Sequence, residues 1–425
     1  MRTFAAATAV AALSLTLAST PSDAQAATSK TTSFGMFASA FGSRVTGGDI
    51  PVNSGDLAYE TTGCTRQTGK TKTNNAAGVT LTGLGKVGAV TSHTWTAKSG
   101  KTVASNSTQN VASIVLSQSA LGKLSIKGIH SQSRAYHNGS GFHATATVNV
   151  ATLAFTDPLG IEHDLKLPGV GKTLSIGSLA TITVGGQTKA VTKHHAIATA
   201  VGLTIKVPST STTISVGHSR AAIYDRAKSA VFGGYADAAD ASVLGGAVSL
   251  GQTPLTKMPC LGTGGKLATK SVAALPTTNP LSGVVSVSGL TSGERASQNA
   301  KKASGYTFAR VANVTLGDDQ IVIKGLRGQA NGSWRKGKGY QVSTKGTTFA
   351  SITAAGKSIT AAQLRTILNK VDISGLAKIQ TNVVLKRSKT TIEVAALRLT
   401  LLDATDQTKT VVNLGRARFA VHHAG

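Results

Sequence analysis

The stretch "YHNGSGFHATATVNVATLAF", Tyr136 to Phe155, decides the fold class, because polar and apolar side chains alternate along most of it with a period of two. This alternation is typical of a strand with one buried face. Of the 425 residues, 40% are hydrophobic, 14% are charged and 4% are aromatic, and the 47 glycines favour many tight turns. The sequence therefore predicts an all-β protein. Helical spacing of Leu364, Ile367 and Leu368 predicts one short helix near 360–371.

The chain repeats itself after about 197 residues, which indicates a tandem duplication. "LSIKGI" (Leu124–Ile129) matches "IVIKGL" (Ile321–Leu326), "GCTRQTGK" (Gly63–Lys70) matches "PCLGTGGK" (Pro259–Lys266), and "LTIKVPSTSTTISVGHSRAAI" (Leu203–Ile223) matches "LTLLDATDQTKTVVNLGRARF" (Leu399–Phe419). The matched segments follow the same order in both copies. We predict two diverged, β-sandwich-like units, 33–231 and 232–425, which fold either as separate sandwiches or as one intertwined sheet system.

The opening stretch contains two histidines, and the repeat helps to decide whether they form a site. "YHNGSGF" (Tyr136–Phe142) aligns without a gap to "WRKGKGY" (Trp334–Tyr340), so the aromatic residues and glycines recur while the histidines do not. Repeated features of this kind favour a hairpin, with glycines at the tip and the pairs Tyr136 with Phe142 and Trp334 with Tyr340 meeting across the strands. A metal site that gathers His130, His137 and His143 is the less favoured alternative.

The only two cysteines, Cys64 and Cys260, occupy the same position in the two copies. If the copies pack around a pseudo-two-fold axis, equivalent positions near that axis face each other. In an exported chain a disulfide between Cys64 and Cys260 is then the first expectation. Two free thiols, or bonds to other chains, are the alternatives.

The N-terminus indicates export. Arg2 precedes an apolar run that ends near Leu17, and Ala24-Gln25-Ala26 has the pattern of a cleavage site, so residues 1–26 are predicted to be a signal peptide rather than a first core helix. No membrane-spanning segment is expected in the mature chain. Its formal charge stays at +27, because processing removes one basic and one acidic residue. Such an excess predicts attraction to polyanions, and self-repulsion that keeps the protein soluble is the competing explanation.

Local motifs predict no catalytic residue, no cofactor and no metal. The three "GK[ST]" fragments lack the first glycine of a phosphate-binding loop, and no zinc-protease helix or nucleophile elbow occurs. The sharpest binding candidate is the second hairpin tip, where Arg335, Lys336 and Lys338 alternate with glycines whose amides would help to hold an anion. A solvated basic turn is the simpler interpretation. With 4% aromatic residues, an extended stacking platform and a specific nucleic-acid readout are not expected.

Three segments resemble the choice-of-anchor P family of actinobacterial exported proteins. They are "AFGSRVTGG…SGDLAYETTGC", "SRAYHNGSGFHATATVNVA" and "GYADAADAS…GQTPLTKMPC", and the resemblance extends from about Ser33 to Gly425. It implies a secreted or surface protein without an established activity, and it supplies no catalytic residues. This chain shows no recognisable anchor, so we expect release or retention at the cell surface by charge.

Together these observations favour a secreted, non-enzymatic protein that binds anionic envelope or extracellular polymers through dispersed Lys and Arg side chains. A structural or matrix protein without a specific ligand is the second hypothesis. The third is a hydrolase whose site is assembled from residues far apart in the sequence.

Overall fold

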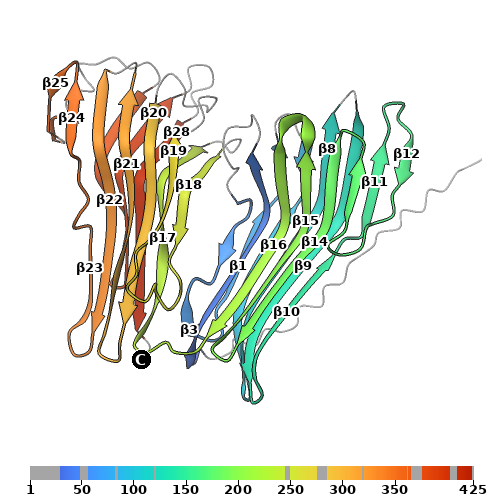
Figure 1. Ribbon diagram of the computed structural model, residues 1–425, viewed down its shortest axis with the longest axis horizontal. Helices are drawn as coiled ribbons and strands as arrows, with labels where there is room; N and C mark the ends of the chain where they lie inside the picture. The colour runs from blue at the N-terminus through green and yellow to red at the C-terminus, as the bar shows by residue number, and fades with distance from the viewer. Residues whose placement is uncertain are drawn as a thin grey trace, which may run out of the picture.

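A computed structural model describes residues 29–47, 56–81, 85–118, 121–244, 249–274, 285–317, 320–360, 362–364, 376–402 and 409–423. In these ranges nearly all regular structure is β-strand and every strand pair is antiparallel (Figure 1), which confirms the predicted all-β fold. The predicted signal peptide, 1–26, lies outside the described residues. Within them, no helix has the length and apolar character needed to cross a membrane.

The first unit is a sandwich of two sheets. One sheet joins the first and last long strands of the unit and is called the terminal sheet. Its strand order is β13 (Thr173–Ile176), β14 (Ala180–Thr192), β15 (His195–Val207), β16 (Thr212–Tyr224), β1 (Thr31–Gly47) and β2 (Glu60–Thr61). In addition, β3 (Thr65–Gln67) pairs with β1. A 3-10 turn, Pro208–Thr210, connects β15 to β16.

Its second sheet carries the hairpin of the opening stretch and is called the hairpin sheet. The order is β12 (Glu162–Asp164), β11 (Thr152–Thr156), β9 (Gly122–Asn138), β8 (Thr102–Gln118), β6 (Gly85–Val87) and β5 (Val79–Leu81). In addition, β10 (Gly141–Asn149) pairs with β9, and β7 (Val90–Ser99) lies between β8 and β4 (Thr71–Ala76).

The second unit has the same arrangement. Its terminal sheet has the order β18 (Ser249–Lys257), β17 (Ala230–Leu244), β28 (Lys409–His423), β27 (Thr391–Leu402) and β26 (Leu376–Arg387). Its hairpin sheet has the order β19 (Ala268–Ala274), β20 (Val285–Gln298), β21 (Lys302–Leu316), β22 (Ile321–Arg335), β24 (Ser351–Ala354) and β25 (Lys357–Ser358), with β23 (Gly339–Ser343) paired to β22. Since no sheet formed by the described residues contains strands of both units, these residues form separate sandwiches rather than one intertwined system.

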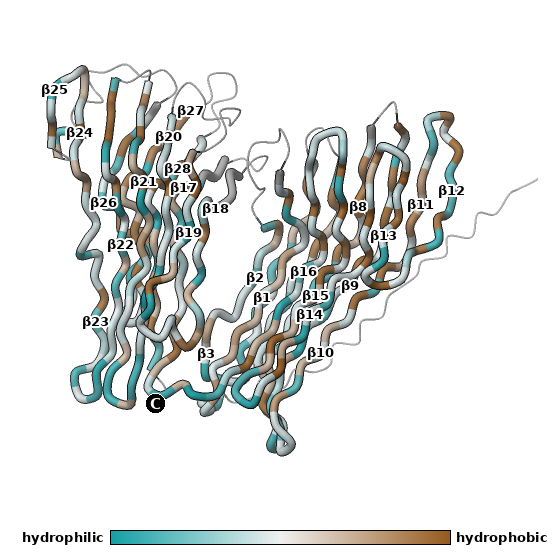
Figure 2. The backbone as a smooth tube through the Cα atoms, viewed as in Figure 1, coloured by the Kyte–Doolittle hydropathy of each residue, from teal (hydrophilic) through white to brown (hydrophobic). Residues whose placement is uncertain are grey.

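Each sandwich has a large apolar core away from the hairpin tips, a band of small polar side chains about midway along the long hairpins, and further apolar residues next to the tips. Leu, Ile and Val side chains from both sheets form the apolar cores, and Figure 2 shows apolar and polar residues alternating along the long strands. Nearer the hairpin tips, small hydroxyl side chains bond directly to the opposite sheet. The Ser107 hydroxyl donates to the Ser39 carbonyl at 2.7 Å, and the Thr307 hydroxyl donates to the Arg418 carbonyl at 3.0 Å. These bonds satisfy buried polar groups and bring the two sheets close together.

The repeated "KGI" and "KGL" motifs each place a left-handed glycine within a long strand of the hairpin sheet, β9 and β22. Gly128 has a φ of 63° and Gly325 a φ of 61°, a left-handed conformation that side chains with a Cβ adopt rarely. A Cβ on Gly128 would lie 2.7 Å from the Cβ of Ala151, and one on Gly325 would lie 2.6 Å from that of Ala350. Both the backbone conformation and the close neighbour therefore require glycine, and this explains why the motif recurs.

A helical turn is present where the sequence predicts a helix. Residues 362–364 are helical, and the side chains of Thr360 and Gln363 form a reciprocal cap at the start of this turn. Leu364 is fully buried in the core of the second unit. The remainder of the predicted helix, 365–371, lies outside the described residues.

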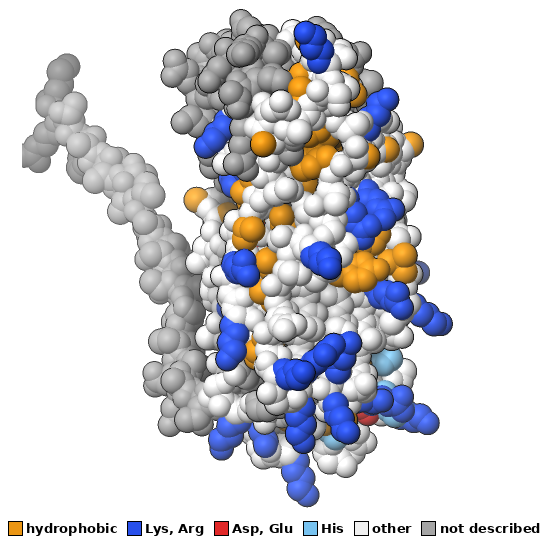
Figure 3. Space-filling model, turned by 90° about the vertical axis from the view of Figure 1, so that its left-hand side faces the viewer, with side chains coloured by type: hydrophobic (Ala, Val, Ile, Leu, Met, Phe, Trp, Pro, Cys, Tyr) orange, Lys and Arg blue, Asp and Glu red, His pale blue; other side chains and the backbone are white. Residues whose placement is uncertain are grey.

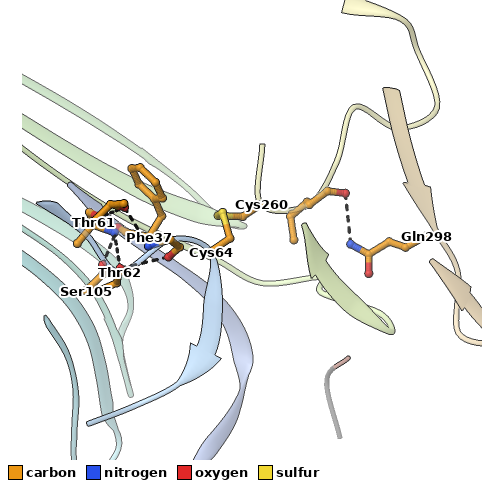
Figure 4. The surroundings of a disulfide bond; sticks show 10 residues. Phe37, Thr61, Thr62, Cys64, Ser105, Cys260 and Gln298 are labelled. Carbon is orange, nitrogen blue, oxygen red and sulfur yellow. Dashed lines mark hydrogen bonds between the residues drawn. A yellow bond between two sulfur atoms is a disulfide. The ribbon is translucent and has the colours of Figure 1, made fainter. Parts of the chain in front are cut away.

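A disulfide joins the two units. Cys64 and Cys260 are bonded, with their Cα atoms 5.3 Å apart, which confirms the predicted bridge (Figure 4). The two cysteines pack with Val231 and Ala227, and Phe37, Tyr224 and Leu261 are the partly buried apolar residues around them. On the side of the second unit, the Gln298 side chain donates to the Leu261 carbonyl and accepts from the Ser229 and Ala230 amides, so it fixes the segment through which the chain enters the second unit.

Candidate anion-binding surface

The hairpin sheet of the second unit is markedly basic. Residues 285–360 contain eleven Lys and Arg residues but only Glu294, Asp318 and Asp319 as acids, and no histidine. The two aspartates lie outside the described residues. Glu294 is 6% exposed and points into the sandwich, so it offers no charge to the surface. The outward side of this sheet, in the part of it that the structure describes, thus presents cationic groups without carboxylates.

The predicted tip residues Arg335, Lys336 and Lys338 are all exposed, and the fold adds other cations to them. The amide of Lys336 donates to the carbonyl of Lys301 at 3.0 Å, which places the turn between β20 and β21 beside the turn between β22 and β23. In the former turn, the Asn299 side chain accepts from the amides of Lys301 and Lys302, both at 2.9 Å. The basic tip is defined here as Lys301, Lys302, Arg335, Lys336 and Lys338.

The side chains of the basic tip, rather than its amides, are available to an anion. The Lys336 amide is bonded to Lys301, and the Lys338 amide donates to the Arg335 carbonyl at 3.1 Å. The prediction that glycine amides of this turn help to hold an anion is not tested by these two bonds, which occupy lysine amides. In Figure 3, Lys and Arg side chains crowd the lower part of this side of the second unit, with hardly any acidic side chain in view.

The hairpin aromatics meet in the second unit but not in the first. Trp334 lies directly opposite Tyr340 across β22 and β23, and the Trp334 ring stacks on His423 with centroids 3.7 Å apart. In the first unit, Tyr136 lies opposite His143, and Phe142 lies opposite His137, so the predicted pair of Tyr136 with Phe142 is wrong. The two turns differ in length, with two residues between Asn138 and Gly141 but three between Arg335 and Gly339, and this shifts the register.

The histidines of the first hairpin act within the turn. The ring nitrogen Nε2 of His143 lies 3.1 Å from both the Asn138 side-chain oxygen and the Ser140 hydroxyl, and Tyr136 stacks on the same ring. His130 is bonded instead to the side chain of Asn110 at 2.6 Å. Among the described residues no group of three or more His, Cys, Asp or Glu side chains could hold a metal ion.

A buried ionic network supports the terminal sheet of the second unit. The guanidinium of Arg416 donates to Glu393 at 2.7 and 2.8 Å and to Asp240 at 2.6 Å, and the Tyr235 hydroxyl donates to Glu393 at 2.9 Å. Beside it, burial and then the charge of Asp240 raise the pKa of Asp237 well above its ordinary value. These groups come from β17, β27 and β28, and their contacts with one another indicate a role in the fold.

Titratable groups also lie where the units approach each other. Burial lowers the pKa of His218, which stacks on Phe41, to about 4, so that this imidazole is neutral at pH 7. The ammonium of Lys257, from β18 of the second unit, lies 5.1 Å from the centre of the Tyr59 ring in the first. Arg44 and Asp56 form a two-bond ion pair at 2.6 and 2.7 Å. Each of these groups contacts another residue of the protein, while the buried Nδ1 of His218 has no hydrogen-bond partner among the described residues.

Sequence reasoning missed Lys301 and Lys302 as part of the basic tip. The signal was available, because "NAKK", Asn299 to Lys302, is a polar turn between two alternating stretches, in the place of "SGKT", Ser99 to Thr102, in the first copy. What the sequence does not contain is the distance between this turn and the next one, since that depends on the pairing of β21 with β22.

Comparisons with known proteins do not identify this chain. No protein-family model matches it, and a search of curated proteins finds no significant match. Among solved structures, a vaccine antigen form of transferrin-binding protein B from Haemophilus parasuis is 8% identical, with 91% of this chain and 76% of that chain covered and a TM-score of 0.10. The toluene transporter TodX of P. putida is 8% identical, with 92% and 88% covered and a TM-score of 0.14. Likenesses at this level carry no argument about fold or function.

Proposed function

We propose that this protein is a secreted, non-enzymatic β protein that associates electrostatically with anionic cell-envelope or extracellular polymers. The observation that carries the proposal is the basic tip, where two neighbouring turns present five exposed cationic side chains on a sheet with no outward carboxylate among its described residues. A cluster of this kind attracts a polyanion more strongly than the same charges spread evenly, because each anionic segment meets several cations within a Debye length of about 8 to 10 Å.

The test is retention on purified cell walls and on immobilised polyphosphate as the NaCl concentration rises. In one variant, Lys301, Lys302, Arg335, Lys336 and Lys338 are all replaced by Gln. The matched control replaces five exposed lysines of the first unit by Gln: Lys86, Lys123, Lys127, Lys172 and Lys189. Both variants lose the same formal charge, so they separate the effect of position from that of net charge.

We expect the tip variant to elute at much lower salt than the wild type, and the control variant to shift only slightly. The logarithm of the binding constant should fall linearly with the logarithm of salt concentration, with a shallower slope for the tip variant. Equal shifts in both variants would show that charge acts without a defined surface. Retention that does not change with salt would overturn the electrostatic proposal and leave the matrix role.

A further inference from the structure

An open pocket of about 670 Å³ lies on the outer face of the second hairpin sheet. Strand register places two rows of outward side chains beside each other across β20, β21, β22 and β23. One row is Arg295, Tyr306, Asn331 and Ser343, and the other is Ser297, Ser304, Ser333 and Gln341. All eight residues line the pocket, together with the intervening row Ala296, Gly305, Gly332 and Val342.

Glycine explains why the sheet approaches its partner sheet closely at this place. A Cβ on Gly332 would lie 2.6 Å from the ring of Phe419 in the terminal sheet, and one on Gly305 would lie 2.5 Å from the Cβ of Ala296. The two glycines are direct cross-strand neighbours. The missing side chain of Gly332 lets β22 lie against Phe419, and both glycines form part of the pocket lining.

The pocket offers hydrogen-bonding groups that the described part of the protein leaves unused. The side chains of Arg295, Ser297, Ser304, Ser333 and Gln341 have no hydrogen-bond partner among the described residues, whereas Asn331 is held by Gln329 at 2.7 Å and by the Lys345 carbonyl at 2.8 Å. Hydroxyl and amide groups both donate and accept, which matches the hydroxyl groups of a sugar. Tyr306 adds a ring whose apolar face suits the C–H face of a pyranose.

The charges around the pocket select an acidic occupant. Arg295, within the pocket, presents a planar guanidinium that suits a carboxylate. On one side, Arg310 and Arg327 flank the Phe308 ring at 5.1 and 4.6 Å, and on the other the strands lead to the basic tip. Cations at both ends of the pocket fit an extended chain better than a single sugar. One stacking ring does not make the platform that single-stranded nucleic acids use.

We infer that this pocket binds a segment of a carboxylated polysaccharide, with Arg295 at a carboxylate and Tyr306 beneath a sugar ring. This inference rests on the proposed function and names the class of polymer. Arg310, Arg327 and the basic tip then hold neighbouring anionic sugars of the same chain. The equivalent place in the first unit differs, because Tyr136 stacked on His143 stands where the second unit has Ser333 and Gln341.

The experiment measures calorimetric binding of an oligogalacturonate, a neutral oligosaccharide of the same length, single-stranded DNA and polyphosphate at physiological salt. The variants are Arg295→Ala, Tyr306→Ala and the conservative Tyr306→Phe. Arg134→Ala, at the position of Asn331 in the first unit, is the matched control. Circular dichroism and thermal unfolding show that each variant is folded.

We expect the oligogalacturonate to bind at least tenfold more tightly than the neutral oligosaccharide. Arg295→Ala and Tyr306→Ala should each weaken it at least tenfold. Tyr306→Phe, which keeps the ring, should weaken it much less than Tyr306→Ala, and Arg134→Ala, outside the pocket, should stay within about twofold of the wild type. Polyphosphate binding should survive Tyr306→Ala. If polyphosphate binds but the oligogalacturonate is no tighter than the neutral sugar, or is unaffected by Tyr306→Ala, the pocket inference fails while the proposed function stands. Tighter binding of DNA also overturns the inference, and if no polyanion binds, both fail.

Discussion

The two hairpin sheets share one scaffold but present different chemistry. In the first unit, one outward row reads Trp95, Asn106, Arg134 and Thr145, and in the second the equivalent row reads Arg295, Tyr306, Asn331 and Ser343. Residues 85–160 contain four histidines, six Lys or Arg and one acid, whereas 285–360 contain no histidine and eleven Lys or Arg. The left-handed glycines Gly128 and Gly325 recur in the two units, whereas the outer faces have diverged.

The two hairpin tips show how little is needed to change a surface. Their sequences align without a gap, yet the turn of the first has two residues and that of the second has three. Neighbouring residues of a strand point to different faces of the sheet, so a shift of one residue places Phe142 and Tyr136 on different faces. Tyr340, in contrast, remains paired with Trp334 on the same face. Similar sequences at the two tips therefore produce different pairs of neighbours.

The largest expected loss of stability comes from removing the disulfide that joins the two units. We expect the double variant Cys64→Ala/Cys260→Ala to lose up to about 5 kcal/mol of unfolding free energy, because the bridge closes a loop of 196 residues. Without a shared sheet or a bridge, the units should unfold in two transitions in scanning calorimetry. Wild-type protein with its disulfide reduced serves as the control, because it lacks the bridge but keeps both cysteine side chains. One transition at an unchanged temperature would show that other contacts couple the units.

The sequence predicts the scaffold well and the surface less well. Alternation and the repeat are local properties, and they lead to the all-β fold, the sandwich-like units and the disulfide between Cys64 and Cys260. The pairing of Tyr136 depends on turn length, and the approach of Lys301 to Lys336 depends on which strands are neighbours. Neither property can be predicted from the periodicity of a single strand.

The pocket was missed for the same reason. Arg295, Tyr306 and Asn331 are separated by 11 and 25 residues in the sequence, and only antiparallel pairing places them in one row. A single sequence marks outward positions but does not state which of them become neighbours across a sheet. The sequence also does not show that Gly332 lies against Phe419, because this contact depends on how the second sheet packs.

A second prediction tests the shared scaffold at equal positions. We expect Gly128→Ala in the first unit and Gly325→Ala in the second each to cost about 3 kcal/mol, since both combine a left-handed backbone with a neighbouring Cβ at less than 3 Å. Gly337→Ala is the control, because it has a φ of 77° but no atom within 4 Å of the added Cβ, so only the backbone term remains. The measurement is urea unfolding. If the loss of unfolding free energy at Gly128 or Gly325 is no larger than that at Gly337, the close neighbouring Cβ does not contribute to the requirement for glycine.

The smallest effect concerns a difference between the two interiors. Glu294 faces inward beside Thr307, at the position that Thr94 occupies beside Ser107 in the first unit. Burial, opposed by Lys270, raises the pKa of Glu294 from 4.5 to about 7. The folded state then keeps the proton at pH values where the unfolded state has released it, so the contribution of Glu294 to stability is highest below about pH 4.5 and falls as the pH rises toward 7.

Replacing Glu294 with Thr, as in the first unit, should remove this fall, which is roughly 2.5 kcal/mol between about pH 5 and pH 8 if one pKa unit corresponds to about 1.4 kcal/mol. Urea unfolding across this range measures it, and Glu294→Gln keeps the size of the side chain while removing the charge. Gln and Thr should flatten the profile equally if ionisation is the cause. If the plot of unfolding free energy against pH becomes flat with Thr but not with Gln, the effect comes from packing. The two interiors would then differ at this position in the size of the side chain rather than in its charge.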